Sequence, residues 1–127
     1  MSSSTQSVSI EAFPVPVQAF FAAMNDHDAD ALVALFPEDG MVNDIQREFW
    51  GPGSIRRWVE KEITGVKVVA ARITEAKEHY GDVIVSAAMD GEYDKTKVPD
   101  PLILTYYFTL SGDRIARLFI SGNKPGY

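Results

Sequence analysis

The 127-residue sequence predicts a single α+β domain in which three N-terminal helices pack on a curved antiparallel β-sheet. Apolar residues recur at helical spacing in the first half of the chain and alternate with period two from Val66 onward. The length allows one hydrophobic core and leaves little room for a second. Residues 1–9 are polar and are expected to form a disordered tail, so the domain is placed at residues 10–127.

The three predicted helices each have a start signal and one apolar face. The first is entered at Pro14 and Pro16, Asp28 is a good N-cap for the second, and Gly51 opens the third, for which Gly65 is the expected stop. The apolar faces, in chain order, consist of Val17, Phe20, Phe21 and Met24, then Leu32, Leu35 and Phe36, then Ile55, Trp58, Val59 and Ile63.

The strands are predicted from alternation and turn residues. A short strand at Met41–Asp44 and a return at residues 46–49 separate the second and third helices. Longer strands are expected at residues 66–80, 83–93, 102–110 and 114–120. Gly81-Asp82 and Ser111-Gly112-Asp113 are the expected hairpin turns. Val83, Val85, Ala87 and Met89 share one face of their strand.

Composition narrows the possible partners and locations. The net charge is −6, the pI is about 4.8, and Lys and Arg are scattered, so nucleic acid is not an expected partner. No apolar run approaches the length of a membrane span. The chain has no cysteine, which excludes disulfides and thiolate nucleophiles. The N-terminus lacks the pattern of a secretory signal, and a cytoplasmic protein is expected.

Three local patterns accompany this order of elements. The first is a helix–Asp–helix joint at residues 20–32, and the second is Met41-Val42-Asn43-Asp44 followed by Phe49-Trp50-Gly51 and Ile55-Arg56-Arg57-Trp58. The third is a closing hairpin from Tyr107-Phe108-Thr109-Leu110 through Gly112 to Arg114-Ile115. Over about residues 12–122, the chain resembles the NTF2-like superfamily, in particular its SnoaL-like and ketosteroid-isomerase-like branch.

The resemblance implies a cone with a pocket at its open end and an Asp at the end of the first short strand as general base. Asp44 matches that position. In such isomerases a Tyr of the first helix and a neutral Asp of a late strand hold the developing oxyanion, and these positions fall on Phe20 and Tyr106 here. One donor is therefore lost and the other is replaced by a phenol. The Asp–Arg–Asp set of related epoxide hydrolases has no match, because residues 102–110 carry no charge.

Each candidate residue also has a simpler interpretation. Asp44 in an apolar pocket would gain a higher pKa suited to a base, or it caps a turn at a strand end. Tyr106 would donate to a substrate oxygen, or it is a core tyrosine. The expected substrate-binding residues are Phe20, Met24, Trp50, Trp58, Val85, Ala87, Leu104 and Phe108, and for Trp58 and the helix residues core packing is the alternative.

Cofactor and metal sites are not expected. His27 and His79 have no carboxylate spacing around them that predicts a metal site, and Asp26, Asp28 and Asp30 lack the glycine and glutamate of a calcium loop. Glycine-rich nucleotide motifs and a serine-hydrolase elbow are absent from the sequence.

An apolar outer face of the late strands predicts a homodimer. Its residues are Ile103, Thr105, Tyr107, Thr109 and Phe119.

Two functions remain open from the sequence. One is a cofactor-independent isomerase or cyclase that removes a proton next to a carbonyl of a small, largely apolar molecule. The other is a non-catalytic module that binds such a ligand or serves in assembly; a collapsed cone without any cavity would indicate an interaction adaptor.

Overall fold

The computed structural model describes residues 12–123, so the predicted tail at residues 1–9 lies outside the described part of the chain. The helices are α1 (Val15–Asn25), α2 (Ala29–Ala34) and α3 (Gly51–Glu62). The strands are β1 (Met41–Asp44), β2 (Arg47–Trp50), β3 (Val69–His79), β4 (Asp82–Asp90), β5 (Ile103–Ser111) and β6 (Arg114–Ser121), and the short 3-10 turns are η2 (Thr64–Val66) and η3 (Lys95–Lys97).

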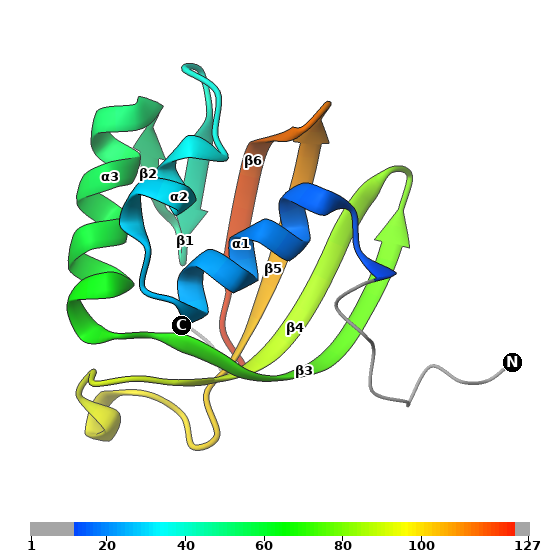
Figure 1. Cartoon of the computed structure of the whole chain (residues 1–127). Helices are drawn as coiled ribbons and strands as arrows, with labels where there is room; N and C mark the ends of the chain where they lie inside the picture. The colour runs from blue at the N-terminus through cyan, green and yellow to red at the C-terminus, as the bar shows by residue number, and fades with distance from the viewer. Residues whose placement is uncertain (1–11, 124–127) are drawn as a thin grey trace, which may run out of the picture.

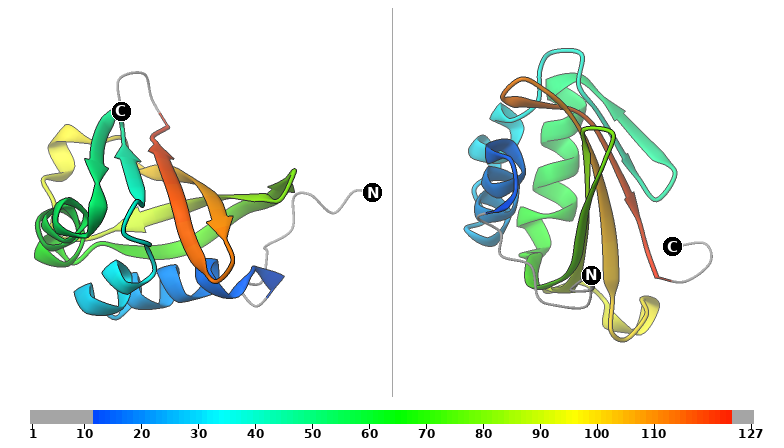
Figure 2. Two further views of the ribbon diagram at one scale, coloured as in Figure 1. Left: turned by 90° about the horizontal axis from the view of Figure 1, so that it is seen from above. Right: turned by 90° about the vertical axis from the view of Figure 1, so that its right-hand side faces the viewer.

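The strands form one curved sheet in the order β2-β1-β6-β5-β4-β3. The helices lie against its concave face, and the described chain places no helix on the other face (Figure 1, Figure 2). Two register irregularities in β3, near Ala70 and Ile73, are bulges of the kind that bend a strand. The α+β class with three helices and a curved sheet is therefore confirmed.

One pairing differs from the prediction of a purely antiparallel sheet. Strand β1 pairs in parallel with β6, with Asp44 opposite Ile120, while all other neighbours are antiparallel. The local alternation of apolar residues cannot reveal this pairing, because β1 joins a strand from the other end of the chain.

The helices form as their sequence signals predict. All four residues of the predicted α1 face are buried, and the Oδ1 of Asp28 accepts a hydrogen bond of 3.1 Å from the backbone N–H of Ala31. In α3, Trp58 and its apolar neighbours on the same face are buried against the core. Leu35 is the exception, because α2 ends at Ala34 and leaves this side chain half-buried.

Two predicted boundaries are wrong for backbone reasons. The chain does not enter β3 at Val66: η2 follows α3, and Lys67 at φ 52° turns the backbone toward Val69. The β3–β4 turn is made by Tyr80 and Gly81, both at positive φ, and not by Gly81 and Asp82. A pair of positive φ values is the twist that suits a tight hairpin.

An aromatic cluster lies at the centre of the core, between α1 and the sheet. Its rings are separated by 5.3 to 6.1 Å between centroids. The members are Phe20, Phe21, Tyr106 and Phe108.

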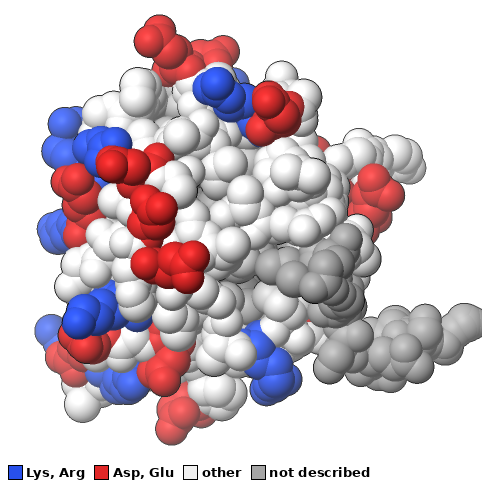
Figure 3. Space-filling view, viewed as in Figure 1, with Lys and Arg blue, Asp and Glu red and all other residues white. Residues whose placement is uncertain are grey.

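No helix within residues 12–123 is long and apolar enough to cross a membrane. On the face shown in Figure 3, basic and acidic side chains lie close together along the left edge, and a few acidic side chains follow one another toward the middle.

Candidate functional site

A pocket of about 900 Å³ lies on the concave side of the sheet, between the end of β1, the C-terminal part of α3 and the segment that connects β4 to β5. Its apolar wall consists of Ile45, Trp58, Ile63, Val66, Val68, Met89, Leu102, Leu104, Tyr106 and Ile120. Its polar wall consists of Asp44, Arg47, Lys61, Glu62, Tyr93, Asp94 and Lys97. A mainly apolar pocket with a few converging polar groups is the usual form of a small-molecule site.

Asp44 is the carboxylate that lies deepest among the polar groups, with a side chain 13% exposed. Its Oδ2 accepts a hydrogen bond of 2.9 Å from the indole N–H of Trp58 and one of 3.1 Å from Arg47. Burial raises the pKa of Asp44 above its ordinary value, although the bonds from Trp58 and Arg47 act in the opposite direction. Both bonds reach the same oxygen, and Oδ1 has no hydrogen-bond donor among the described residues.

Arg47 connects Asp44 to α3. Its two terminal nitrogens donate to the two carboxylate oxygens of Glu62, at 2.6 and 2.8 Å, and one of them also reaches Asp44. These hydrogen bonds from Arg47 lower the pKa of Glu62. The pocket therefore has an acid–arginine–acid row along its edge, in which the middle cation is shared.

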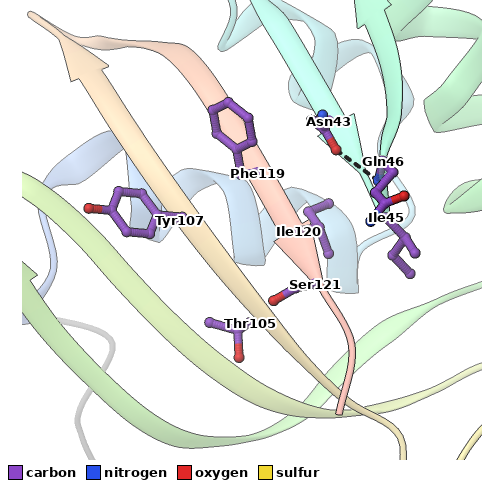
Figure 4. A pocket seen from close by; sticks show the side chains of 8 residues that line it. All are labelled: Asn43, Ile45, Gln46, Thr105, Tyr107, Phe119, Ile120 and Ser121. Carbon is purple, nitrogen blue, oxygen red and sulfur yellow. Dashed lines mark hydrogen bonds between the residues drawn. The ribbon is translucent and has the colours of Figure 1, made fainter. Parts of the chain in front are cut away.

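The β1–β2 turn explains why Asp44 and Arg47 face each other. Ile45 and Gln46 have φ of 52° and 69°, so the hairpin closes in two residues and places Asp44 directly opposite Arg47. The side chain of Asn43 accepts a hydrogen bond of 2.9 Å from the backbone N–H of Gln46 (Figure 4). A β-branched residue rarely adopts such a positive φ, so Ile45 is held there by its surroundings, including a backbone bond of 3.0 Å to Ile120.

Tyr106 supplies the polar atom of the apolar wall. The residue is 2% exposed, and its hydroxyl contacts the sulfur of Met89 at 3.9 Å. A thioether is a weak acceptor, so this hydroxyl keeps most of its capacity to donate to a ligand oxygen. Burial raises the pKa of Tyr106, and the negative charge of Asp44 adds to the effect. The phenol is therefore a neutral donor at neutral pH.

The sequence of this chain matches the model of a known family. A family model described as a SnoaL-like domain matches residues 17–118. The chain belongs to the SnoaL-like domain family. This confirms the resemblance inferred from the order of elements and the local patterns.

Solved structures agree with the family assignment. A "putative polyketide cyclase" from Sinorhizobium meliloti is 30% identical with a TM-score of 0.78, covering 90% of this chain and 100% of its own. A protein of ketosteroid-isomerase-like fold from Catenulispora acidiphila, in complex with trimethylamine, is 25% identical with a TM-score of 0.67, covering 85% of each chain. A Sphaerobacter thermophilus protein at 22% identity and a TM-score of 0.71, covering 86% of this chain and 94% of its own, shares the fold. A comparison with curated proteins found no match.

Four of the residues predicted from the sequence come together in this SnoaL-like pocket. They are Asp44, Tyr106, Trp58 and Leu104. Trp58 is both core and site, because its ring is buried while its N–H reaches Asp44.

The other predicted binding residues lie outside the lining of this pocket. Five are fully buried in the core behind the wall, where neighbouring rings and strands fill the space around them: Phe20, Met24, Val85, Ala87 and Phe108. Trp50 lies on the surface, 53% exposed, with its N–H donating to Glu48 and Arg117 over its ring. Trp50 alternates with Arg47 along β2, so its side chain points to the face opposite the one that lines the pocket.

Sequence reasoning missed Glu62 and the wall formed by the segment between β4 and β5. Glu62 follows Trp58 by four residues on a helix, so both face the same side, and this spacing was the available signal. Tyr93, Asp94 and Lys97 lie in an irregular segment with no periodicity, and only the fold brings them to the pocket.

A second, shallower hollow of about 430 Å³ lies on the opposite face of the sheet. Figure 4 shows its lining side chains on β1, β5 and β6 and the β1–β2 turn. Three of the residues expected at a dimer interface belong to it: Thr105, Tyr107 and Phe119. The homodimer itself stays a prediction.

Proposed function

We propose that this SnoaL-like protein is a cofactor-independent enzyme of the isomerase or cyclase type, acting on a small, largely apolar carbonyl compound in the pocket. The observation that carries the proposal is the carboxylate of Asp44, which stands at the wall of an apolar pocket with a raised pKa and has one oxygen that accepts no hydrogen bond from residues 12–123. The pocket would be the open end of the cone that the resemblance implies.

Proton abstraction is the step that this geometry supports. The Oδ1 of Asp44 takes a proton from the carbon next to the substrate carbonyl, so a C–H bond breaks and an O–H bond forms on Asp44. The electron pair moves onto the carbonyl oxygen and gives an enolate. Return of the same proton to another carbon, as the C=O bond re-forms, completes an isomerisation. In an aldol-type cyclisation the enolate carbon instead attacks a second carbonyl carbon, whose C=O bond opens to an alkoxide, and the proton held by Asp44 passes to that alkoxide.

Tyr106 is the proposed donor to the enolate oxygen. Its hydroxyl is buried, neutral and bonded only to a sulfur among the described residues. A hydrogen bond made where charge develops stabilises the transition state more than the ground state. Phe20 stands at 5.7 Å from Tyr106 between ring centroids and offers no second donor, so the phenol acts alone in this role.

Solvent deuterium exchange tests the proposal without knowledge of the natural substrate. In D2O, NMR would follow loss of the α-protons of a panel of enolisable cyclic ketones and lactones. Wild-type protein is expected to accelerate exchange, Asp44→Asn to abolish the acceleration, and Tyr106→Phe to reduce it by about 10²-fold. Asp94→Asn is the matched control, because Asp94 lines the same pocket but uses its Oδ1 to cap η3. Equal loss in both Asn variants, or no exchange with wild type, would refute the proposal.

A non-catalytic ligand-binding or assembly module is the second candidate. The observation that favours it is the existing hydrogen bonding of Asp44 to Trp58 and Arg47, which gives the carboxylate a structural role without any substrate. In that case Asp44→Asn changes the free energy of unfolding and leaves ligand affinity and the rate of exchange unchanged. The cytoplasmic location also stays a prediction from the sequence.

A further inference from the structure

The Arg47–Glu62 ion pair has a geometry that separates it from the other surface pairs of the molecule. Two parallel N–H···O bonds of 2.6 and 2.8 Å join the guanidinium to both oxygens of Glu62. The side chain of Glu62 is 27% exposed, whereas the acids paired with Arg56 and Lys95 are all more than half exposed. Bidentate Arg–carboxylate pairs fix orientation as well as charge.

The Arg47–Glu62 pair limits the number of N–H groups through which Arg47 can bind the carboxylate of Asp44. The guanidinium presents a planar fork that can engage one carboxylate with both terminal nitrogens. Glu62 occupies both, so Asp44 receives a single side-chain bond of 3.1 Å, and the Nε–H of Arg47 goes to the backbone oxygen of Asp44 at 3.3 Å. Arg47 is thereby held beside the carboxylate without enclosing it.

We propose that Glu62 is a positioning residue of the site: by binding both terminal nitrogens of Arg47, it limits the contact of the arginine with the carboxylate of Asp44 to one N–H and keeps the second carboxylate oxygen open to substrate. This inference rests on the proposed role of Asp44 as a base, and it adds a residue that controls how strong that base is.

The charges around Asp44 support the assignment. Arg47 and Glu62 act on it in opposite directions: the cation lowers the pKa of Asp44, and the second carboxylate raises it. The remaining charged groups on the pocket wall are Lys61 of α3 and Asp94 and Lys97 of the β4–β5 segment, and all three are exposed to screening solvent. The phenols of Tyr93 and Tyr106 also line the pocket, and burial raises the pKa of Tyr106, which keeps it uncharged at neutral pH.

Removal of either partner therefore shifts Asp44 in a different direction. Without the charge of Glu62, the repulsion disappears and the fork of Arg47 is released to bind Asp44 with both nitrogens, so the pKa of Asp44 falls and the base weakens. Without the guanidinium, Asp44 loses its cation and faces Glu62 directly, so its pKa rises. A pair that only tied β2 to α3, without acting on Asp44, would leave the pKa of Asp44 unchanged in both variants.

The test is an NMR titration of the Asp44 carboxyl in protein labelled with ¹³C at aspartate, with the signal identified by its absence from Asp44→Asn. Glu62→Gln is expected to shift the midpoint to lower pH, Arg47→Gln to higher pH, and the double variant to a value between them. Glu60→Gln is the matched control, because Glu60 lies on the same helix but pairs with Arg56, and it should leave the midpoint unchanged. Amide spectra verify that each variant is folded. Glu62→Asp keeps the carboxylate and is expected to leave the midpoint close to that of the wild type.

The same variants are then compared in the exchange assay. Glu62→Gln is expected to reduce exchange at neutral pH by about three- to tenfold, a part of the roughly 10²–10⁴-fold that a general base contributes. Shifts of the same sign in both single variants, or none, overturn the positioning role whatever the activity. Opposite shifts in a protein that catalyses no exchange would uphold the positioning role and refute the proposed function.

Discussion

Replacement of Trp58 by Phe tests the bond that anchors Asp44. The indole is 2% exposed and donates a hydrogen bond of 2.9 Å to the carboxylate of Asp44, which is largely shielded from solvent. A hydrogen bond to a charged group contributes about 1.5–3 kcal/mol to stability. The smaller ring leaves space in the core, which costs about 1 kcal/mol more. The variant is therefore expected to lose about 2.5–4 kcal/mol of unfolding free energy at neutral pH.

The pH dependence of that loss separates the hydrogen bond from packing. Burial raises the pKa of Asp44 in the folded protein, so the stability contributed by its protonation is present at low pH and is lost as the pH rises through the folded pKa. The bond from Trp58 favours the ionised form, and its removal raises the folded pKa further. The loss in Trp58→Phe should thus shrink by about 1 kcal/mol as Asp44 becomes protonated, because a bond to a neutral acceptor is roughly half as strong.

Urea unfolding of the wild type and the variant at a series of pH values measures both quantities. Trp50→Phe is the matched control: this indole also donates to a carboxylate, at 3.1 Å from Glu48, but it is 53% exposed. Trp50→Phe should therefore lower the unfolding free energy by no more than about 0.5 kcal/mol. An equal loss in the two variants, or a loss in Trp58→Phe that does not change with pH, would refute the reasoning about Asp44.

Three further predictions concern the β1–β2 hairpin, the contact of α1 with β3 and the outer face of the sheet. Gln46→Gly removes a side chain from a residue at φ 69° and should raise the unfolding free energy by about 0.5–1 kcal/mol. An unchanged or lower unfolding free energy would contradict the conformation of this hairpin. Asn25→Ala should cost about 1–2 kcal/mol in thermal or urea unfolding, because this side chain bonds both the N–H and the carbonyl of Ala70 and ties α1 to β3. Phe119→Glu should convert the predicted homodimer to a monomer in sedimentation, and a wild-type monomer at micromolar concentration would contradict the dimer.

The fold was largely predictable because its signals are local. A few neighbouring residues determine the apolar face of α1 and the cap at Asp28, and the packing of the fold keeps both as predicted. The alternation in β4 likewise matches its burial. The parallel pairing of β1 with β6 was missed because no local pattern carries information about a partner strand distant in the sequence.

The site was predictable only in part. Asp44 and Tyr106 were found through their positions in the resemblance, and both line the pocket. Phe20 was expected in the pocket because an aromatic residue on a buried face looks the same whether it fills the core or lines a cavity. The contact of Arg47 with Glu62 depends on a two-residue turn with positive φ at Ile45, a conformation that its β-branched side chain disfavours and that the sequence therefore conceals.

The parallel pairing of β1 and β6 also has a consequence for biosynthesis. The strand that bears Asp44 is made early, but its inner neighbour in the sheet is the last described strand, with Asp44 opposite Ile120. Contacts between such distant segments close late, since a long loop must first be ordered. A chain that ends before β6 would contain Asp44, Arg47, Trp58 and Glu62 and still lack the strand with which β1 pairs in parallel. The ribosome must therefore synthesise the chain through β6 before the pocket can exist.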